Sequence, residues 1–225
     1  MIKDLTKAKK YDCPVKFEVT NCEAGWVDMK CDFRGIVLTF AVSDIGDMPS
    51  TLIEVAYMLH SNYDNYVEVL RNIKVDDEVS DITDQFGSGG WDANLGATFC
   101  WDEEPRSNDW HVYYDKKDFG KEDYDLIIEI KRSIGCYEEY RFVVTYRDFC
   151  YAIAKCFTDV IKKYGFSGYD TRSYQDYVIV RHLLIVKAYA LGLLGTWIGW
   201  RDGNLDMDYF DLTFDQELEL LRMDM

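Results

Sequence analysis

The stretch WDEEPRSNDWHV, residues 101–112, carries the side chains of this chain that could most readily do chemistry. Its acids, histidine and tryptophans are Trp101, Asp102, Glu103, Glu104, Asp109, Trp110 and His111. Carboxylates beside an imidazole are the groups of general acid–base catalysts and of hydrolytic metal centres. The same carboxylates beside exposed tryptophans would instead form a docking surface for a basic protein. The elements that position these residues decide between the two chemistries.

Apolar and polar residues alternate over 97–101 and again over 110–114, which predicts two strands joined by a turn. We expect a hairpin in which Trp101 and Trp110 stand at the two necks and pair across the ladder, with the two glutamates at the solvated tip. A catalytic carboxyl needs a shifted pKa, which requires burial or a close like charge, and a tip supplies little of either. The hairpin therefore favours a surface role for its acids.

Metal ligation by Asp102, Glu103, Asp109 and His111 stays open, because a tight turn could bring these side chains together. No second histidine or cysteine stands at ligand spacing from any of the three histidines of the chain. We therefore expect no bound metal and no other cofactor.

A second acidic stretch, residues 202–213, resembles a calcium-binding loop in the spacing of its acids. It has Met207 in place of the central glycine and Thr213 in place of the bidentate glutamate. An Asp-Gly turn that leads into an acidic helix start explains this stretch better than a calcium site does.

The charge of the whole chain restricts its partners. A formal net charge of −16 argues against nucleic acid and anionic lipid, because both are bound by basic surfaces. A basic protein partner remains compatible with this charge. With 225 residues, 48% of them hydrophobic, the chain can bury a large core without disulfides, and we expect a single domain over residues 1–225.

The cysteines and the hydropathy of the chain indicate a cytoplasmic protein. Seven cysteines are an odd number and form no C-x-x-C pair, so we expect reduced thiols, and no local signature marks one of them as a nucleophile. Residues 1–14 have no apolar run of the kind that a secretory signal needs. The most apolar stretch, residues 177–195, is interrupted by Arg181, His182 and Lys187 and predicts a buried helix rather than a membrane span.

The order of the expected elements repeats. Strand periodicity changes to helix periodicity twice, which defines two βββα-like units over residues 13–62 and 108–165. Asp47 and Asp148 are the expected N-caps of the two helices. A helical part over residues 174–225 follows, and its last helix starts at a capping-box signature.

Hairpins followed by helices, without strand–helix–strand alternation, predict an α+β fold with a mainly antiparallel sheet and additional C-terminal helices. The two βββα-like units are either a diverged duplication or ordinary hairpins that happen to precede helices.

The turn DFRG, residues 32–35, is expected to join two strands of the first unit, with Gly35 free to adopt a positive φ.

Three features of the chain resemble a loose group of uncharacterised bacterial proteins. They are the EAGW turn at residues 23–26, the helix that begins at Asp47 after a strand, and the W-D-E-E-P-x-x-x-x-W run at residues 101–110. Those proteins share a tryptophan-bearing N-terminal hairpin and a later acid-proline-tryptophan hairpin, and the likeness covers about the first two thirds of the chain. The resemblance implies a small cytosolic bacterial protein. It carries over no catalytic residue, because the group has no established activity.

We expect a non-catalytic cytosolic protein-binding domain whose acidic surface receives a basic partner. The residues of the expected site are Trp101, Asp102, Glu103, Glu104, Asp109 and Trp110. The acids would supply the electrostatic field, and any exposed part of the tryptophans would supply the anchoring area. An immunity or inhibitor role against a basic toxin is one concrete form of this function.

Two alternatives belong to other classes. A hydrolytic or metal-dependent enzyme could use carboxylates of the acidic loops with His111 as base or ligand. A subunit of a homo-oligomer could make its contact through a sheet edge or the C-terminal helix. A pocket with convergent, partly buried carboxylates would favour the enzyme, and a convex acidic face would favour the binding protein.

Overall fold

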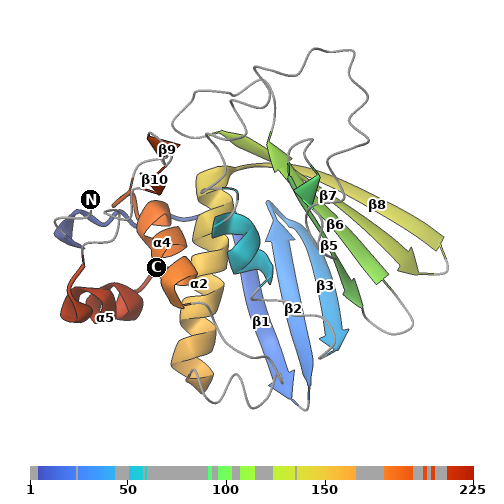
Figure 1. Ribbon diagram of the computed structural model, residues 1–225. Coiled ribbons are helices and arrows are strands. Elements are labelled where there is room, and N and C mark those ends of the chain that lie inside the picture. Colours follow the sequence, from blue (N-terminus) through green and yellow to red (C-terminus); the bar gives the residue numbers. More distant parts are fainter. Residues whose placement is uncertain are drawn as a thin grey trace.

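The chain folds into antiparallel sheets with its helices gathered to one side of them (Figure 1). The structure, a computed structural model, describes residues 5–23, 25–43, 51–57, 59, 91–92, 96–102, 107–114, 124–134, 136–165, 180–194, 200–201, 204–205 and 212–225. Strands and helices are segregated along the chain rather than alternating, so the predicted α+β class is confirmed.

The first sheet is three-stranded and follows a short 3-10 helix, η1 (Leu5–Lys7). Its strands, in spatial and chain order, are β1 (Val15–Glu23), β2 (Trp26–Phe33) and β3 (Ile36–Ser43). Arg34 and Gly35 take φ values of 56° and 95° in the turn between β2 and β3, and the Asp32 carboxylate accepts the Gly35 N–H at 2.6 Å. The positive φ predicted for Gly35 is confirmed, and it matches the twist of a two-residue hairpin.

The second sheet is five-stranded and also follows chain order. Its strands are β4 (Trp91–Asp92), β5 (Gly96–Asp102), β6 (Ser107–Tyr114), β7 (Asp125–Ile134) and β8 (Cys136–Thr145). A helix over residues 51–57 comes after the first sheet, and α2 (Tyr146–Tyr164) begins directly after β8. Three strands followed by a helix therefore occur twice along the chain, while a duplication of the two units stays a prediction.

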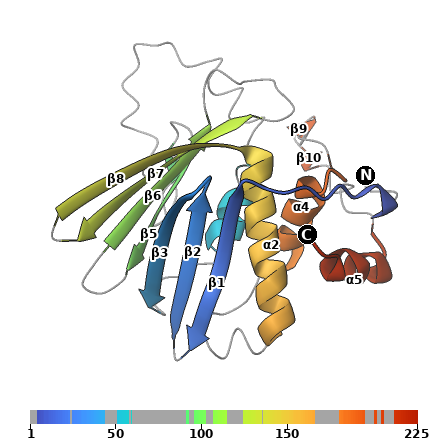
Figure 2. The ribbon, with the colours of Figure 1, turned by 180° about the vertical axis from the view of Figure 1, so that it is seen from behind.

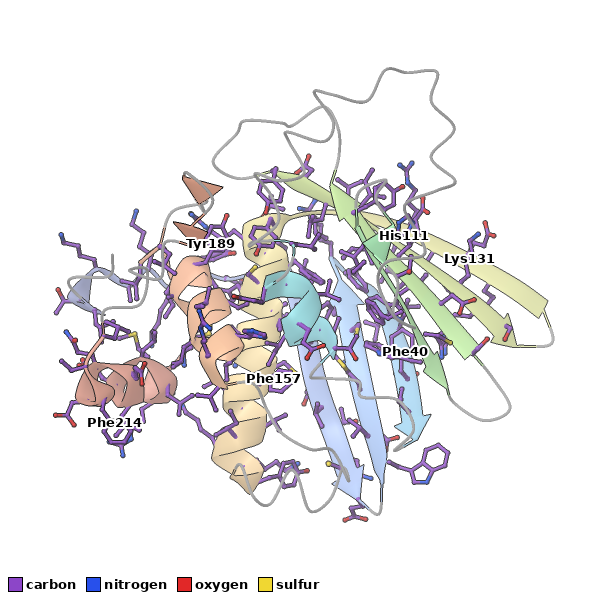
Figure 3. All side chains as sticks on the ribbon, in the orientation of Figure 1. Phe40, His111, Lys131, Phe157, Tyr189 and Phe214 are labelled. Atoms are coloured by element: carbon purple, nitrogen blue, oxygen red, sulfur yellow. The ribbon has the colours of Figure 1, made fainter. Side chains whose placement is uncertain are left out.

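Aromatic side chains pack the two sheets against each other. Phe33 of β2 stacks on Phe142 of β8, with ring centroids 4.1 Å apart. Phe40 of β3 lies between the sheets, 5.3 Å from the Trp101 ring and 5.4 Å from the Trp110 ring (Figure 3). Offset and edge-to-face contacts of this kind add to the free energy gained by burying large rings. The interior between the sheets is therefore an aromatic layer.

A polar link joins the same two sheets at one end of the aromatic layer. Arg132 of β7 donates to the backbone carbonyl of Thr39 on β3 at 3.0 Å, and its guanidinium lies over the Phe40 ring at 5.1 Å. The Arg132 Nε donates to the side-chain oxygen of buried Asn108 at 3.0 Å. Because Asn108 also donates to the Trp101 carbonyl, its buried amide is satisfied on both sides.

Helix α2 begins three residues earlier than the sequence predicted. Thr145 is its N-cap, since the Thr145 hydroxyl accepts the Asp148 N–H at 3.0 Å, so the prediction of Asp148 as the cap is wrong. The Asp148 carboxylate is instead buried and accepts the Tyr11 hydroxyl at 3.0 Å, with the Arg34 guanidinium 3.7 Å away. It thereby ties the N-terminal arm and the β2–β3 turn to the start of α2. At the other end, α2 is capped by Gly165, which has a φ of 71°, and Lys162 and Lys163 lie in its last turn.

The C-terminal part adds α4 (Val180–Ala190), the short strands β9 (Trp200–Arg201) and β10 (Asn204–Leu205), and α5 (Phe214–Arg222). The capping box predicted for the last helix is present between Thr213 and Gln216. Buried Lys187 of α4 donates to the carbonyls of Leu221 and Met223 and so holds the end of α5. Within the described ranges, no helix is both long and apolar enough to cross a membrane.

Several sequence predictions fall outside the described residues. They are the Asp47 cap, the tip residues Glu103 and Glu104, residues 174–179 of the predicted helical part, and most of the stretch 202–213. The side chain of Asp102 is likewise outside the described part, although its backbone ends β5.

We expect Trp110→Ala to lower the free energy of unfolding by about 3–5 kcal/mol, because it removes a fully buried ring from the aromatic layer. Trp26→Ala is the matched control, since the Trp26 side chain is 41% exposed, and it should cost about 1 kcal/mol or less. Urea unfolding followed by circular dichroism measures both. Equal losses for the two variants would contradict the packing described here.

Candidate partner-binding face

Strand alternation gives the five-stranded sheet a buried face and a solvent face. Trp101 on β5, Trp110 and Val112 on β6, and Ile128 on β7 point into the core. The residues between them must point the opposite way, because successive side chains of a strand alternate between faces. We call these residues the outward face: Thr98, Cys100, Asp109, His111, Tyr113, Glu129, Lys131, Glu139, Arg141 and Val143.

The register of the strands orders the outward face into rows. One row runs across four strands through Thr98, His111, Glu129 and Arg141. The next row runs through Cys100, Asp109, Lys131 and Glu139. The labelled helices lie with the three-stranded sheet and leave this side of β5–β8 open in two opposite views (Figures 1 and 2). On the outward face Asp109, Lys131, Glu139 and Arg141 are exposed, while His111, Tyr113 and Glu129 are half-buried.

Glu129 is the centre of the first row. Its carboxylate accepts the Tyr113 hydroxyl at 2.9 Å and lies 3.4 Å from the Arg141 Nε. The His111 Nδ1 lies 3.9 Å from the other Glu129 oxygen. Burial and the hydrogen bond to Glu129 raise the pKa of Tyr113, so this hydroxyl stays a donor near neutral pH. Three neighbours thus hold one carboxylate in place on the sheet.

The second row carries alternating charges on exposed side chains. Asp109 and Lys131 face each other across β6 and β7, and the Lys131 Nζ lies 3.9 Å from a Glu139 carboxylate oxygen. Figure 3 shows His111 and Lys131 on neighbouring strands of this sheet. Ion pairs this exposed contribute little to stability, so these residues are available for contacts with another molecule.

The two tryptophans of the 101–112 stretch are core residues and not the anchors that we expected. Each is 1% exposed, and their ring centroids are 4.5 Å apart, so the predicted pairing across the ladder is confirmed. The two tryptophans are diagonal neighbours on β5 and β6 and not directly opposite each other. The register places Asn108 opposite Trp101 and Phe99 opposite Trp110. Indoles buried by Phe40 offer no surface to a partner.

Of the polar residues that the sequence analysis placed in one site, the structure describes the side chains of Asp109 and His111. Asp109 and His111 lie on the outward face in adjacent rows, as their positions between inward residues require. Glu103, Glu104 and the side chain of Asp102 fall outside the described part of the chain. Of the expected site, the structure therefore shows Asp109 on an exposed face.

Sequence reasoning missed Glu129, Lys131, Glu139 and Arg141. Glu129 and Arg141 lie between inward apolar residues of β7 and β8, so alternation could have placed them outward, whereas Lys131 and Glu139 have only one such neighbour each. The sequence does not determine the register of β7 against β6 and β8, and it is this register that sets Glu129 between His111 and Arg141.

Three buried cysteines, Cys13, Cys31 and Cys156, are poorly suited to nucleophilic catalysis. Burial raises the pKa of Cys13 to about 11, that of Cys156 to about 12, and that of Cys31 well above its ordinary value. These thiols are protonated near neutral pH, and the thiolate is the nucleophilic form. Among the described residues, no group of three His, Cys, Asp or Glu side chains is placed to hold a metal ion.

A groove of about 670 Å³ lies between the N-terminal arm, β1 and α2. Its charged lining consists of Lys10, Asp12, Lys16, Glu18, Lys155 and Asp159. Three lysines and three acids balance, and two of the lysines already pair with acids of the groove. The groove therefore has no excess of negative charge for a basic partner.

We expect the His182 imidazole to stay neutral down to about pH 4. It stacks on the Tyr57 ring at 3.7 Å, and burial, together with neighbouring Arg181, lowers its pKa from 6.5 to about 4. The unfolded chain takes up this proton near pH 6.5 and the folded protein does not. The stability of the wild type relative to His182→Phe should therefore fall as the pH drops from 6.5 to 4, by on the order of 2 kcal/mol. Urea unfolding of both proteins across this range measures the difference, and a constant difference would contradict the burial of a neutral His182.

Comparisons of the chain with protein family models, with curated proteins and with solved structures found no match.

Proposed function

We propose that the protein is a non-catalytic protein-binding domain that receives a basic partner on the outward face of its five-stranded sheet. The observation that carries the proposal is the set of exposed charged side chains on this face, Asp109, Lys131, Glu139 and Arg141, ordered by the strand register. A rigid sheet holds these side chains in position before binding, which lowers the entropic cost of association.

The charge of the chain supports a basic partner. The sequence has 41 acidic and 25 basic residues, and part of the acidic excess lies in segments that connect the strands of the outward face. Glu103 and Glu104 lie in the connection between β5 and β6. Carboxylates that surround a docking face raise the association rate of a cationic partner by electrostatic steering.

The mixed charges of the outward face would supply specificity. Glu129 is held by Tyr113 and Arg141, so a partner meets a fixed carboxylate rather than a mobile one. Lys131 and Arg141 alternate with the acids of the two rows and would repel a partner whose cations stand in the wrong places. The face therefore favours a partner with a matching pattern of charge over cationic proteins in general.

An immunity or inhibitor role against a basic toxin is the concrete form of this function that we favour. Proteins that act on nucleic acids or anionic lipids need basic surfaces. An acidic face that covers such a surface would block access to the substrate. The cytoplasm is the compartment in which we place this activity.

The enzyme alternative has one supporting observation, the His111 imidazole beside the Glu129 carboxylate at 3.9 Å. A carboxylate can orient an imidazole that acts as a base. Such an enzyme would still need carboxylates from the acidic loops to reach this pair. An activity that is lost in His111→Gln, while binding to a basic partner is unchanged, would favour the enzyme.

We predict that Asp109→Lys weakens retention of the basic partner about tenfold, because it reverses a charge in the middle of the outward face. Glu23→Lys makes the same change of charge at an exposed position of β1 and should bind as the wild type does. The measurement is affinity capture by the immobilised proteins from an extract of the source cells at low and moderate salt, with identification of the retained proteins.

Retention that decreases with salt and is lost in Asp109→Lys alone is the expected result, because exposed charges are screened. Capture of no basic protein at low salt would refute the proposed function. Equal capture by Asp109→Lys and Glu23→Lys would show that the outward face is not the docking surface.

A further inference from the structure

Strand β8 forms one edge of the five-stranded sheet. Of the strands that the structure describes, β8 pairs with β7 alone, over the whole length from Cys136 to Thr145. The opposite edge is formed by β4, which has two residues and offers little to pair with. Both views show the β7–β8 hairpin projecting away from α2 and the other helices (Figures 1 and 2). A long edge strand presents backbone donors and acceptors that can pair with another strand.

We propose that β8 pairs with β8 of a second copy of this chain, as an antiparallel, two-fold symmetric extension of the sheet. The register places Tyr140 on the two-fold axis, so that Glu139 of each copy faces Arg141 of the other. These two side chains are 62% and 60% exposed, so both can reach a neighbour on the outward face. The inference is independent of the proposed function, since it concerns the protein by itself.

The charges of β8 favour this register over those centred on Glu139 or Arg141. Residues that face each other in an antiparallel pair point to the same face of the sheet, and successive residues of one strand point to opposite faces. Two copies of one strand can therefore pair only if the two-fold axis passes through a residue and not between two residues. An axis through Glu139 would set two glutamates opposite each other, and an axis through Arg141 would set two arginines opposite each other. Like charges at directly opposite positions destabilise a strand pair, and opposite charges stabilise it.

The same register continues the charge pattern across the joined sheets. In one copy, Asp109, Lys131 and Glu139 alternate in sign along the second row. Beyond the junction, the row would run through Arg141 and Glu129 of the second copy, so the alternation is unbroken. The two-fold axis generates a second row across the junction, and this row carries the same residues in reverse order. Each charged residue at the junction thus keeps its partner on β7 and gains one of opposite charge on the new strand.

Closed two-fold pairing also accounts for an otherwise exposed edge. A C2 interface uses the same surface of both copies and leaves no β8 edge for further addition. The contact is therefore expected to give a dimer and not a fibre.

Charge reversal at β8 tests the proposal. Glu139→Arg sets arginine opposite arginine across the junction, and Arg141→Glu sets glutamate opposite glutamate, so each variant alone should dissociate at least tenfold more readily than the wild type. A mixture of the two variants restores two opposite pairs in a heterodimer. Sedimentation velocity over a range of concentrations measures self-association of each pure protein and of the equimolar mixture.

Two controls keep the outcome interpretable. Asp109→Arg reverses a charge on the same face but on central strand β6, and it should dimerise as the wild type does. Circular dichroism verifies that each single variant is folded before its association is measured. The proposal is overturned if the wild type stays monomeric at the highest concentration reached, if the single variants associate as the wild type does, or if folded variants fail to associate when mixed.

Discussion

The aromatic layer between the two sheets is the constraint on which the rest of the structure depends. Phe40 packs against Trp101 and Trp110, and Phe33 stacks on Phe142, so the inner faces of both sheets are defined by their largest rings. Because a strand has a period of two, burying these residues forces the residues between them to the opposite side. The outward face is in this sense a consequence of the core.

This arrangement separates stability from recognition. The rings that contribute most to folding are buried, and the exposed ion pairs of the outward face contribute little to it. Charged residues on the outward face can therefore change without loss of the fold, and a partner can be recognised by a pattern of charge on a rigid support. The buried Asp148 carboxylate has the opposite role, since its contacts with Tyr11 and Arg34 join three segments of the chain.

Local patterns predicted much of the fold. Alternation placed Asp109 and His111 on the face opposite to that of Trp110, and the turn at Gly35 and the capping box at Thr213 follow from their side chains. The start of α2 was misplaced because Asp148 and Thr145 are both good caps, and the buried contacts that occupy Asp148 come from distant residues. The cluster around Glu129 depends on strand register, which alternation within one strand does not determine. The tryptophans suit both a core and a surface anchor, and the choice is made by Phe40, about sixty residues away in the chain.

The most direct test of this account is an NMR titration of the isotopically labelled protein with its captured basic partner. Binding on the outward face predicts chemical-shift changes concentrated at Thr98, Asp109, His111 and Lys131, with the α2 side of the three-stranded sheet unaffected. Changes concentrated along the groove between the N-terminal arm and α2, with the outward face unperturbed, would contradict the account.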